Sequence, residues 1–236
     1  MFTQRVSHAH VRESALATYM SQIFNYMAGG VAVSGLAAWI TVNSPAIMQA
    51  AVNAQILFLI VWFGFGFFMH KIIFNMQPKT ALMSFVAFSA LTGFALSPLA
   101  LIYTGASIAI AFFTAAFMFA GASLYGYFSK KSLSGWGNFL MMGAWGLIGA
   151  IVVNLLVALF TGSPIEGLSF VISLIAVPLF AGMTAWETNM LKDMYASHAG
   201  DDVHTSRMAI FGATSLYMNF VVMFIHLLHL VGQHRQ

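Results

Sequence analysis

Glu187 is the residue whose place in the sequence most clearly suggests chemistry. It closes an apolar run of about twenty residues, the length of one membrane span, and Lys192 and Asp193 follow it. A carboxylate at the mouth of a span costs free energy unless water, a cation or a polar neighbour meets it, which indicates an ion or proton site. The alternative is an ordinary interfacial residue that ends a helix.

The last apolar stretch of the chain carries a polar stripe. Its members follow one another at spacings of three, four, seven and three, which places them on one face of a helix: Gly212, Ser215, Asn219, His226 and His229. Asn219 is about 16 Å inside the span at helical rise, where an unpartnered amide costs free energy. Two explanations stay open: a hydrogen bond that only holds two spans together, or a polar lining shared with Glu187.

Other side chains that could do chemistry lack the partners which that chemistry needs. His226 and His229 have no third metal ligand fixed by the sequence, so interfacial histidines are the better interpretation. The segment GASL at 121–124 resembles the GxSG motif of rhomboid proteases, but it lacks the second glycine and no base is placed beside its serine. We therefore predict that the protein is not an enzyme and needs no cofactor.

The composition is that of an integral membrane protein. Of the 236 residues, 60% are hydrophobic and 6% are charged, and the mean hydropathy is +0.86, which leaves too little polar surface for a soluble domain. Apolar blocks of about 20 residues fit α-helices that cross a lipid bilayer, not the shorter strands of a barrel. A net charge of +3 without a broad basic patch argues against nucleic-acid binding. We expect an all-α polytopic fold.

The apolar blocks predict a bundle of seven transmembrane helices. Residues 1–22 are expected to form a polar cytoplasmic tail, residues 23–231 the transmembrane domain, and residues 232–236 a short carboxy-terminal tail. Pro98 is expected to kink or end the third span, and Pro178 to bend the sixth. The seven expected spans are 23–42, 55–73, 81–103, 107–128, 139–160, 168–187 and 208–231.

Basic residues predict the orientation of the bundle. With seven spans, eight of the nine lysines and arginines fall on the amino-terminal side of the membrane: Arg5, Arg12, Lys71, Lys79, Lys130, Lys131, Lys192 and Arg207. Only Arg235 falls on the other side. Cytoplasmic loops are enriched in lysine and arginine, so we expect a cytoplasmic amino terminus and a periplasmic carboxy terminus.

Four segments in this order resemble the Bax inhibitor-1 family, also called the transmembrane Bax inhibitor motif family. They are SALTGFALS at 89–97, ASLYGYFSKKSLSGWGN at 122–138, GMTAWETNMLK at 182–192 and ATSLYMNFVVMFIHLL at 213–228. The likeness covers nearly the whole chain and is closest to bacterial members of the inner membrane. It implies a seven-helix fold and a calcium leak that pH tunes through two aspartates on the sixth and seventh helices. It also implies interaction roles in cell death or membrane proteolysis.

The sequence departs from that family pattern at the expected sensor. Glu187 stands in place of the first aspartate, Asn219 in place of the second, and His70 in place of an arginine that locks the pair. The resemblance thus implies an ion pathway and pH sensor of Glu187, Asn219 and His70, with Ser215 and His226 as supporting polar residues. Glu187 is the residue expected to contact a metal ion.

Two functions follow from the resemblance, and they belong to different classes. The first is a pH-sensitive calcium leak channel in the bacterial inner membrane, whose partners are the lipid bilayer and calcium ions. The second is a non-conducting interaction protein that modulates a membrane protease complex or a stress or cell-death response. In the second, the polar face of the last span serves packing alone.

Overall fold

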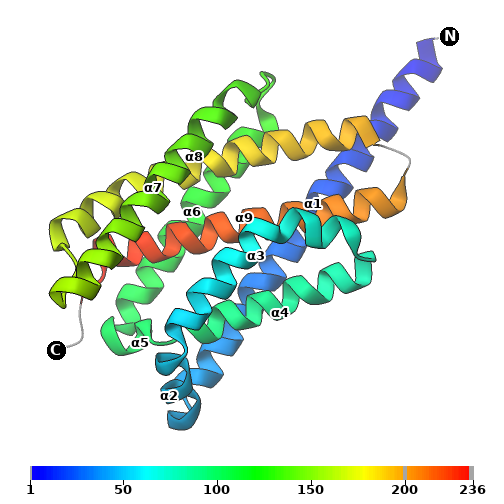
Figure 1. Cartoon of the computed structure of the whole chain (residues 1–236). Coiled ribbons are helices and arrows are strands. Elements are labelled where there is room, and N and C mark those ends of the chain that lie inside the picture. Colours follow the sequence, from blue (N-terminus) through cyan, green and yellow to red (C-terminus); the bar gives the residue numbers. More distant parts are fainter. Residues whose placement is uncertain (1, 199–200, 234–236) are drawn as a thin grey trace. The chain divides into compact units, whose positions relative to one another are not determined.

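The structure is a computed structural model that describes residues 2–198 and 201–233, with side chains except those of residues 2–13, 59, 67, 70 and 198. The described chain is helical and contains no strand (Figure 1). The helices are α1 (Phe2–Val42), α2 (Pro45–Asn53), α3 (Gln55–Asn75), α4 (Pro78–Leu96), α5 (Leu99–Ile102), α6 (Gly105–Phe128), α7 (Ser134–Thr161), α8 (Glu166–His198) and α9 (Asp202–Val231). The all-α prediction is confirmed.

Six helical segments of the described chain are long and apolar enough to cross a membrane: Ser14–Val42, Pro78–Ile102, Gly105–Phe128, Ser134–Thr161, Glu166–Ser197 and Asp202–Val231. A seventh span arises if Pro45–Asn53 and Gln55–Gly66, which are bent by 65° at their junction, cross together. The number of spans within the described residues is therefore six, or seven with that broken pair.

Prolines and short polar side chains set several helix ends. Pro45 and Pro78 occupy the first turns of α2 and α4, where the missing N–H leaves no intrahelical bond unmade. Thr104 caps α6 by accepting a hydrogen bond from the Ser107 amide at 3.2 Å. The expected effect of Pro98 is confirmed, because α4 ends at Leu96 and α5 begins after the proline.

Three boundaries differ from the sequence-based expectation. α1 begins at Phe2, so residues 2–22 are helical and continuous with the first span, and α2 was not expected at all. α8 continues to His198, well past the expected end of its span at Glu187, and it stays continuous through Pro178. Polarity marks where a helix leaves the hydrocarbon, whereas the helix itself continues for as long as its residues tolerate helical backbone.

The described helices form two compact units. The first consists of Met1–Leu99 with Leu191–Tyr217. In it, α1 and α4 approach so closely that a Cβ on Gly93 would meet the backbone of Ser34, and one on Gly30 would meet the ring of Phe85. Small residues of this kind let transmembrane helices pack at short distance. Close packing matters there because the hydrophobic effect does not drive helices together in lipid.

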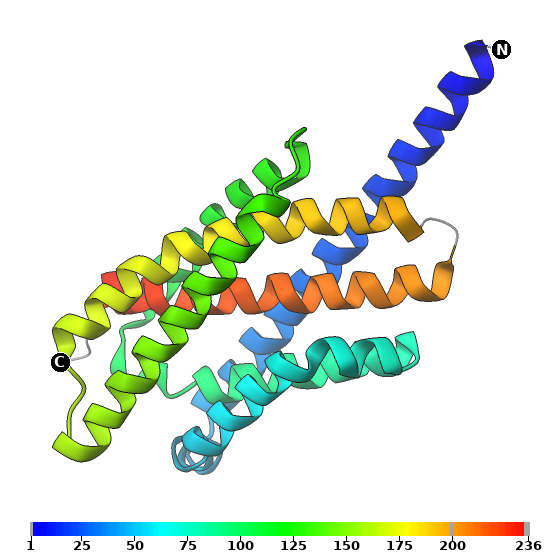
Figure 2. The ribbon, with the colours of Figure 1, turned by 45° about the horizontal axis from the view of Figure 1, so that its top comes forward.

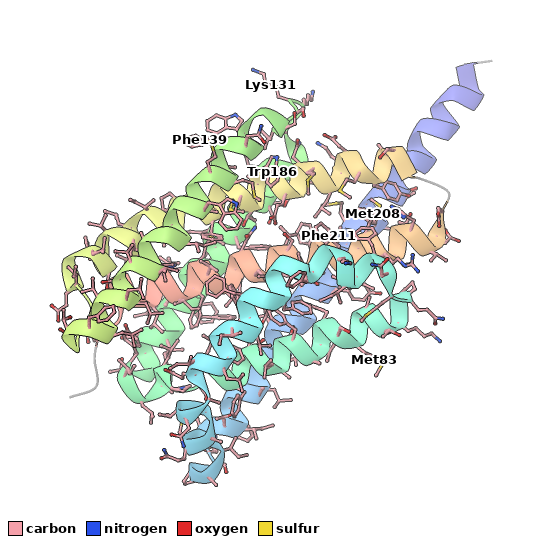
Figure 3. All side chains as sticks on the ribbon, viewed as in Figure 1. Met83, Lys131, Phe139, Trp186, Met208 and Phe211 are labelled. Carbon is pink, nitrogen blue, oxygen red and sulfur yellow. The ribbon has the colours of Figure 1, made fainter. Side chains whose placement is uncertain are left out.

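The second unit consists of Ala100–Met190 with Met218–Gln236. In it, α7 and α8 lie side by side in both views (Figures 1 and 2), around a core of Leu147, Ile172 and Ala176. Gly126 of α6 faces the backbone of Ala185, while Gly137 of α7 faces the indole of Trp186, which is labelled in Figure 3. These contacts position the middle of α8.

Burial differs widely among the candidate spans. In α9, 67% of the most apolar window is buried, compared with 11% in α7. A span with so little buried surface is covered by lipid, whereas α9 must satisfy its polar groups inside the protein. α9 is therefore the span in which polar side chains carry the most information about function.

Candidate functional site

Glu187 of α8 and Asn219 of α9 meet directly. The Asn219 Nδ2 donates a hydrogen bond of 2.8 Å to the Glu187 Oε2, within the second unit. Glu187 is 6% exposed and Asn219 is 3% exposed. The two residues that the sequence indicates as the principal site are thus brought together in a buried pair, and the carboxylate receives a donor where water is excluded.

Two threonines beside Glu187 on α8 show by contrast why Glu187 needs a partner from another helix. Thr184 and Thr188 are fully buried, yet each hydroxyl donates to a backbone carbonyl one turn earlier, that of Phe180 at 2.8 Å and that of Thr184 at 2.7 Å. A threonine hydroxyl can in this way find its hydrogen-bond partner within its own helix. A carboxylate has no hydrogen to donate to such a carbonyl, so Glu187 depends on a donor from elsewhere.

Glu187 does not end its helix. α8 continues for three more turns to His198, and the candidate span runs to Ser197. Lys192, whose polarity suggested the boundary, is partly buried inside this longer helix. The interpretation as a residue that ends a helix therefore does not hold, while the expected position of Glu187 at the mouth of the span stays a prediction.

The other residues of the predicted polar face of α9 differ in burial and in hydrogen bonding. His226 accepts or donates a hydrogen bond of 3.0 Å between its Nδ1 and the Ser173 Oγ of α8. Ser215 is partly buried on α9, one turn before Asn219. His229 is exposed, and its Nδ1 lies 3.5 Å from the Tyr103 hydroxyl.

The expected role of His70 stays a prediction. The residue lies on α3 in the first unit, and its side chain is outside those that the structure describes. Among the described residues, no group of three or more histidine, aspartate or glutamate side chains could hold a metal ion. The expected contact of Glu187 with a metal ion stays a prediction.

Two buried asparagines that sequence reasoning missed hold the loops of the second unit. Asn189 accepts a hydrogen bond from the Leu133 amide at 2.9 Å and donates one to the Gly126 carbonyl at 3.2 Å. Asn154 accepts from the Ile165 amide at 2.9 Å and donates to the Ser169 Oγ at 2.7 Å. An amide within an apolar stretch is the signal that could have found Asn154, because such an amide needs partners inside the membrane.

The helices are apolar, and buried polar side chains join them. One of these contacts contains the acid Glu187. The class of protein is therefore a polytopic helical membrane protein with an ionisable group within its spans. The family model described as "Inhibitor of apoptosis-promoting Bax1" matches residues 16–236. The chain belongs to this family, the Bax inhibitor-1 family, and the resemblance noted from its motifs is confirmed.

Relatives in three bacteria are similar over nearly the whole length. The chain is 38% identical to the uncharacterized protein RP147 of Rickettsia prowazekii, over 94% of this chain and 92% of the relative. It is 33% identical to the inner membrane protein YbhL of Escherichia coli K12, over 94% of each. It is 35% identical to the uncharacterized protein YrjE of Lactococcus lactis, over 94% of this chain and 93% of the relative. The chain is accordingly a multi-pass protein of the bacterial inner membrane.

Proposed function

We propose that the protein is a pH-sensitive calcium leak channel whose ion pathway passes Glu187. The observation that carries the proposal is the 2.8 Å hydrogen bond from Asn219 to a carboxylate that is buried within two membrane spans. An ionisable residue at such a position is expensive in a membrane and typically marks an ion or proton pathway. Family membership supports the same function, since the family resemblance implies a calcium leak.

The hydrogen bond between Asn219 and Glu187 competes with the binding of calcium. Calcium takes carboxylate and amide oxygens as ligands, and both occur here. An ion at Glu187 competes with the Asn219 amide for Oε2, so the hydrogen bond must break before that oxygen can coordinate it. The neutral amide holds the carboxylate without adding a second negative charge, which makes the site a weaker attractor for cations than two acids would be.

A non-conducting interaction protein, acting on a membrane protease complex or in a stress or cell-death response, is the second candidate. It is favoured by the interhelical hydrogen bond itself: the amide meets the carboxylate without an ion, as expected of a bond that only joins α8 to α9. In this candidate the surface that binds the partner lies elsewhere on the bundle.

Calcium flux separates the two functions. Purified protein in liposomes that enclose a calcium dye is expected to leak faster than protein-free vesicles, and Glu187→Gln is expected to slow the leak. Glu166→Gln is the matched control, because it removes the same charge from an exposed position on the same helix. A wild-type rate equal to that of empty vesicles would leave the interaction protein as the function.

We further propose seven spans with the amino terminus in the cytoplasm, where the broken pair of α2 and α3 provides the additional crossing. Support comes from the distribution of lysine and arginine, eight of nine on one side. An alkaline phosphatase fused after Gln236 is then expected to be active in the periplasm. An inactive fusion, with a fluorescent cytoplasmic reporter at the same point, would overturn the seven-span topology.

A further inference from the structure

A chain of hydrogen bonds joins three helices near the carboxy-terminal end of α9. The His226 Nδ1 lies 3.0 Å from the Ser173 Oγ, which also donates to the Ser169 carbonyl at 3.0 Å. The Ser169 hydroxyl in turn accepts from the Asn154 Nδ2 of α7 at 2.7 Å. Ser173 is 2% exposed, so its hydroxyl depends on these protein partners. His226 is the point at which α9 enters this network.

The end of α9 is also attached on a second side. The Gln233 amide donates to the Ser107 Oγ at 2.9 Å, and the Thr104 amide donates to the Gln233 carbonyl at 3.2 Å. The exposed His229 meets the Tyr103 hydroxyl in the same segment. The last turns of α9 are therefore fastened to α8 by His226, and to the residues before and at the start of α6 by the chain that follows the helix.

Few other titratable groups face His226. On α9 itself there is His229, one turn away; the segment before α6 contributes Tyr103; α8 contributes Glu166, exposed two turns before Ser173. Residues 105–124 of α6 and the whole of α7 contain no titratable side chain. His234 and Arg235 follow in the sequence and lie outside the described residues. A proton on His226 thus meets a second histidine on its own helix and no carboxylate from α6 or α7.

We propose that His226 is a second proton-sensitive group of the protein, forming with Ser173 a latch between α9 and α8 that acid opens. The inference rests on the proposed leak, of which the latch is a regulator. Histidine changes charge on acidification. A proton on His226 places a positive charge on a partly buried ring that packs against Ser173. The free-energy cost of that charge falls if the end of α9 moves away from Ser173 and water reaches the ring.

The absence of cysteine in the chain allows the latch to be measured without calcium. Spin labels at Phe170→Cys on α8 and Val231→Cys on α9, both about half exposed at 51% and 48%, report the separation of the two ends within the second unit. In nanodiscs we expect the distance distribution to shift to longer values on acidification from about pH 8 to about pH 4.

Substitutions assign this shift to His226. His226→Asn keeps a hydrogen-bonding group near the Nδ1 position but does not titrate, so it is expected to abolish the shift. His226→Gln is a second non-titrating variant, with the same expectation. His229→Asn leaves the contact of His226 with Ser173 in place, so the shift is expected to remain. A label distance that is the same at about pH 8 and about pH 4, or a shift that survives both substitutions of His226, would overturn the latch.

Calcium efflux from the same preparations separates this inference from the proposed function. If the leak exists and the latch controls it, His226→Asn should remove one part of the pH response, and that part should persist in Glu187→Gln. If no leak is found, the calcium function fails, while a distance shift that depends on His226 still establishes the latch. Efflux whose pH profile is identical in wild type and His226→Asn would show that the latch does not regulate the channel.

Discussion

Two polar contacts of α9, at positions only two residues apart, differ in kind. In the first unit the Tyr217 hydroxyl lies 2.6 Å from the Ser34 Oγ, and the Ser34 hydroxyl is 2.7 Å from the Ser89 carbonyl. In the second unit Asn219 donates to the carboxylate of Glu187. The first contact contains only hydroxyl and carbonyl groups, whereas the second contains an acid.

The comparison teaches that a buried polar group inside a membrane is not by itself a functional site. Around Ser34 the helices approach at Gly30 and Gly93, and the rings of Phe85 and Phe88 pack edge-on to Tyr217. Such a contact stabilises helix packing and has nothing that titrates near neutral pH. The Glu187 contact places an ionisable group in a buried position, where a change of its protonation alters the local electrostatics far more than it would in water.

The largest expected effect concerns the acid. Two carboxylates at hydrogen-bonding distance cannot both ionise cheaply, so Asn219→Asp should create a pair that shares one proton and titrates as a unit. We expect calcium efflux between about pH 5 and pH 8 to depend more steeply on pH in this variant than in wild type. Glu187→Gln keeps the shape of the side chain and removes the titration, so the part of the response that belongs to Glu187 should vanish.

Efflux at a series of pH values, in wild type, Asn219→Asp and Glu187→Gln, measures this difference. Combining Glu187→Gln with His226→Asn separates the pair from the histidine latch, and the double variant should be flat across the range. A pH profile that Asn219→Asp leaves unchanged would mean that the two residues do not form a sensor.

The next effect tests the close packing of the first unit. A methyl group at Gly93 would meet the backbone of Ser34, which cannot turn aside as a flexible side chain can. Gly93→Ala should therefore lower the free energy of unfolding by about 1–3 kcal/mol, as overpacked cores do. Gly29→Ala is the control, because nothing lies within 4 Å of its Cβ position. Thermal unfolding in detergent compares the two, and equal stabilities would contradict the packing of α1 on α4.

The smallest expected effect is that of removing the Tyr217 hydroxyl, which tests the difference between its contact and that of Glu187. Tyr217→Phe removes the hydroxyl that meets Ser34 and keeps the ring against Phe85 and Phe88. The loss of stability should be about 0.5–1.5 kcal/mol, the net value of one hydrogen bond. The pH profile of calcium efflux should stay that of wild type. A changed profile in this variant would show that the hydroxyl network also takes part in the response to protons.

Several features of the molecule were predictable because they depend on local sequence. Apolar blocks of membrane-spanning length identified the helices, and Pro98 marked a helix end, since proline cannot continue the backbone bonding of the preceding turn. The ends of α1 and α8 were not predictable from polarity, because helical backbone continues beyond the hydrocarbon. α2 was missed for a related reason: nine residues are too few to register as a span.

The sequence by itself determined that the protein is a helical membrane protein of this family and that Glu187 and Asn219 are polar residues in an apolar setting. Only the tertiary structure decided that these two residues form a hydrogen bond. It also decided that the hydroxyls of Thr184 and Thr188 bond to carbonyls of their own helix. The same holds for the bonds by which Asn189 and Asn154 accept from loop amides. The physical reason is that spans and motifs follow from composition and order along the chain. The partner of a buried polar group comes from whichever helix packs beside it, and sequence separation does not constrain that choice.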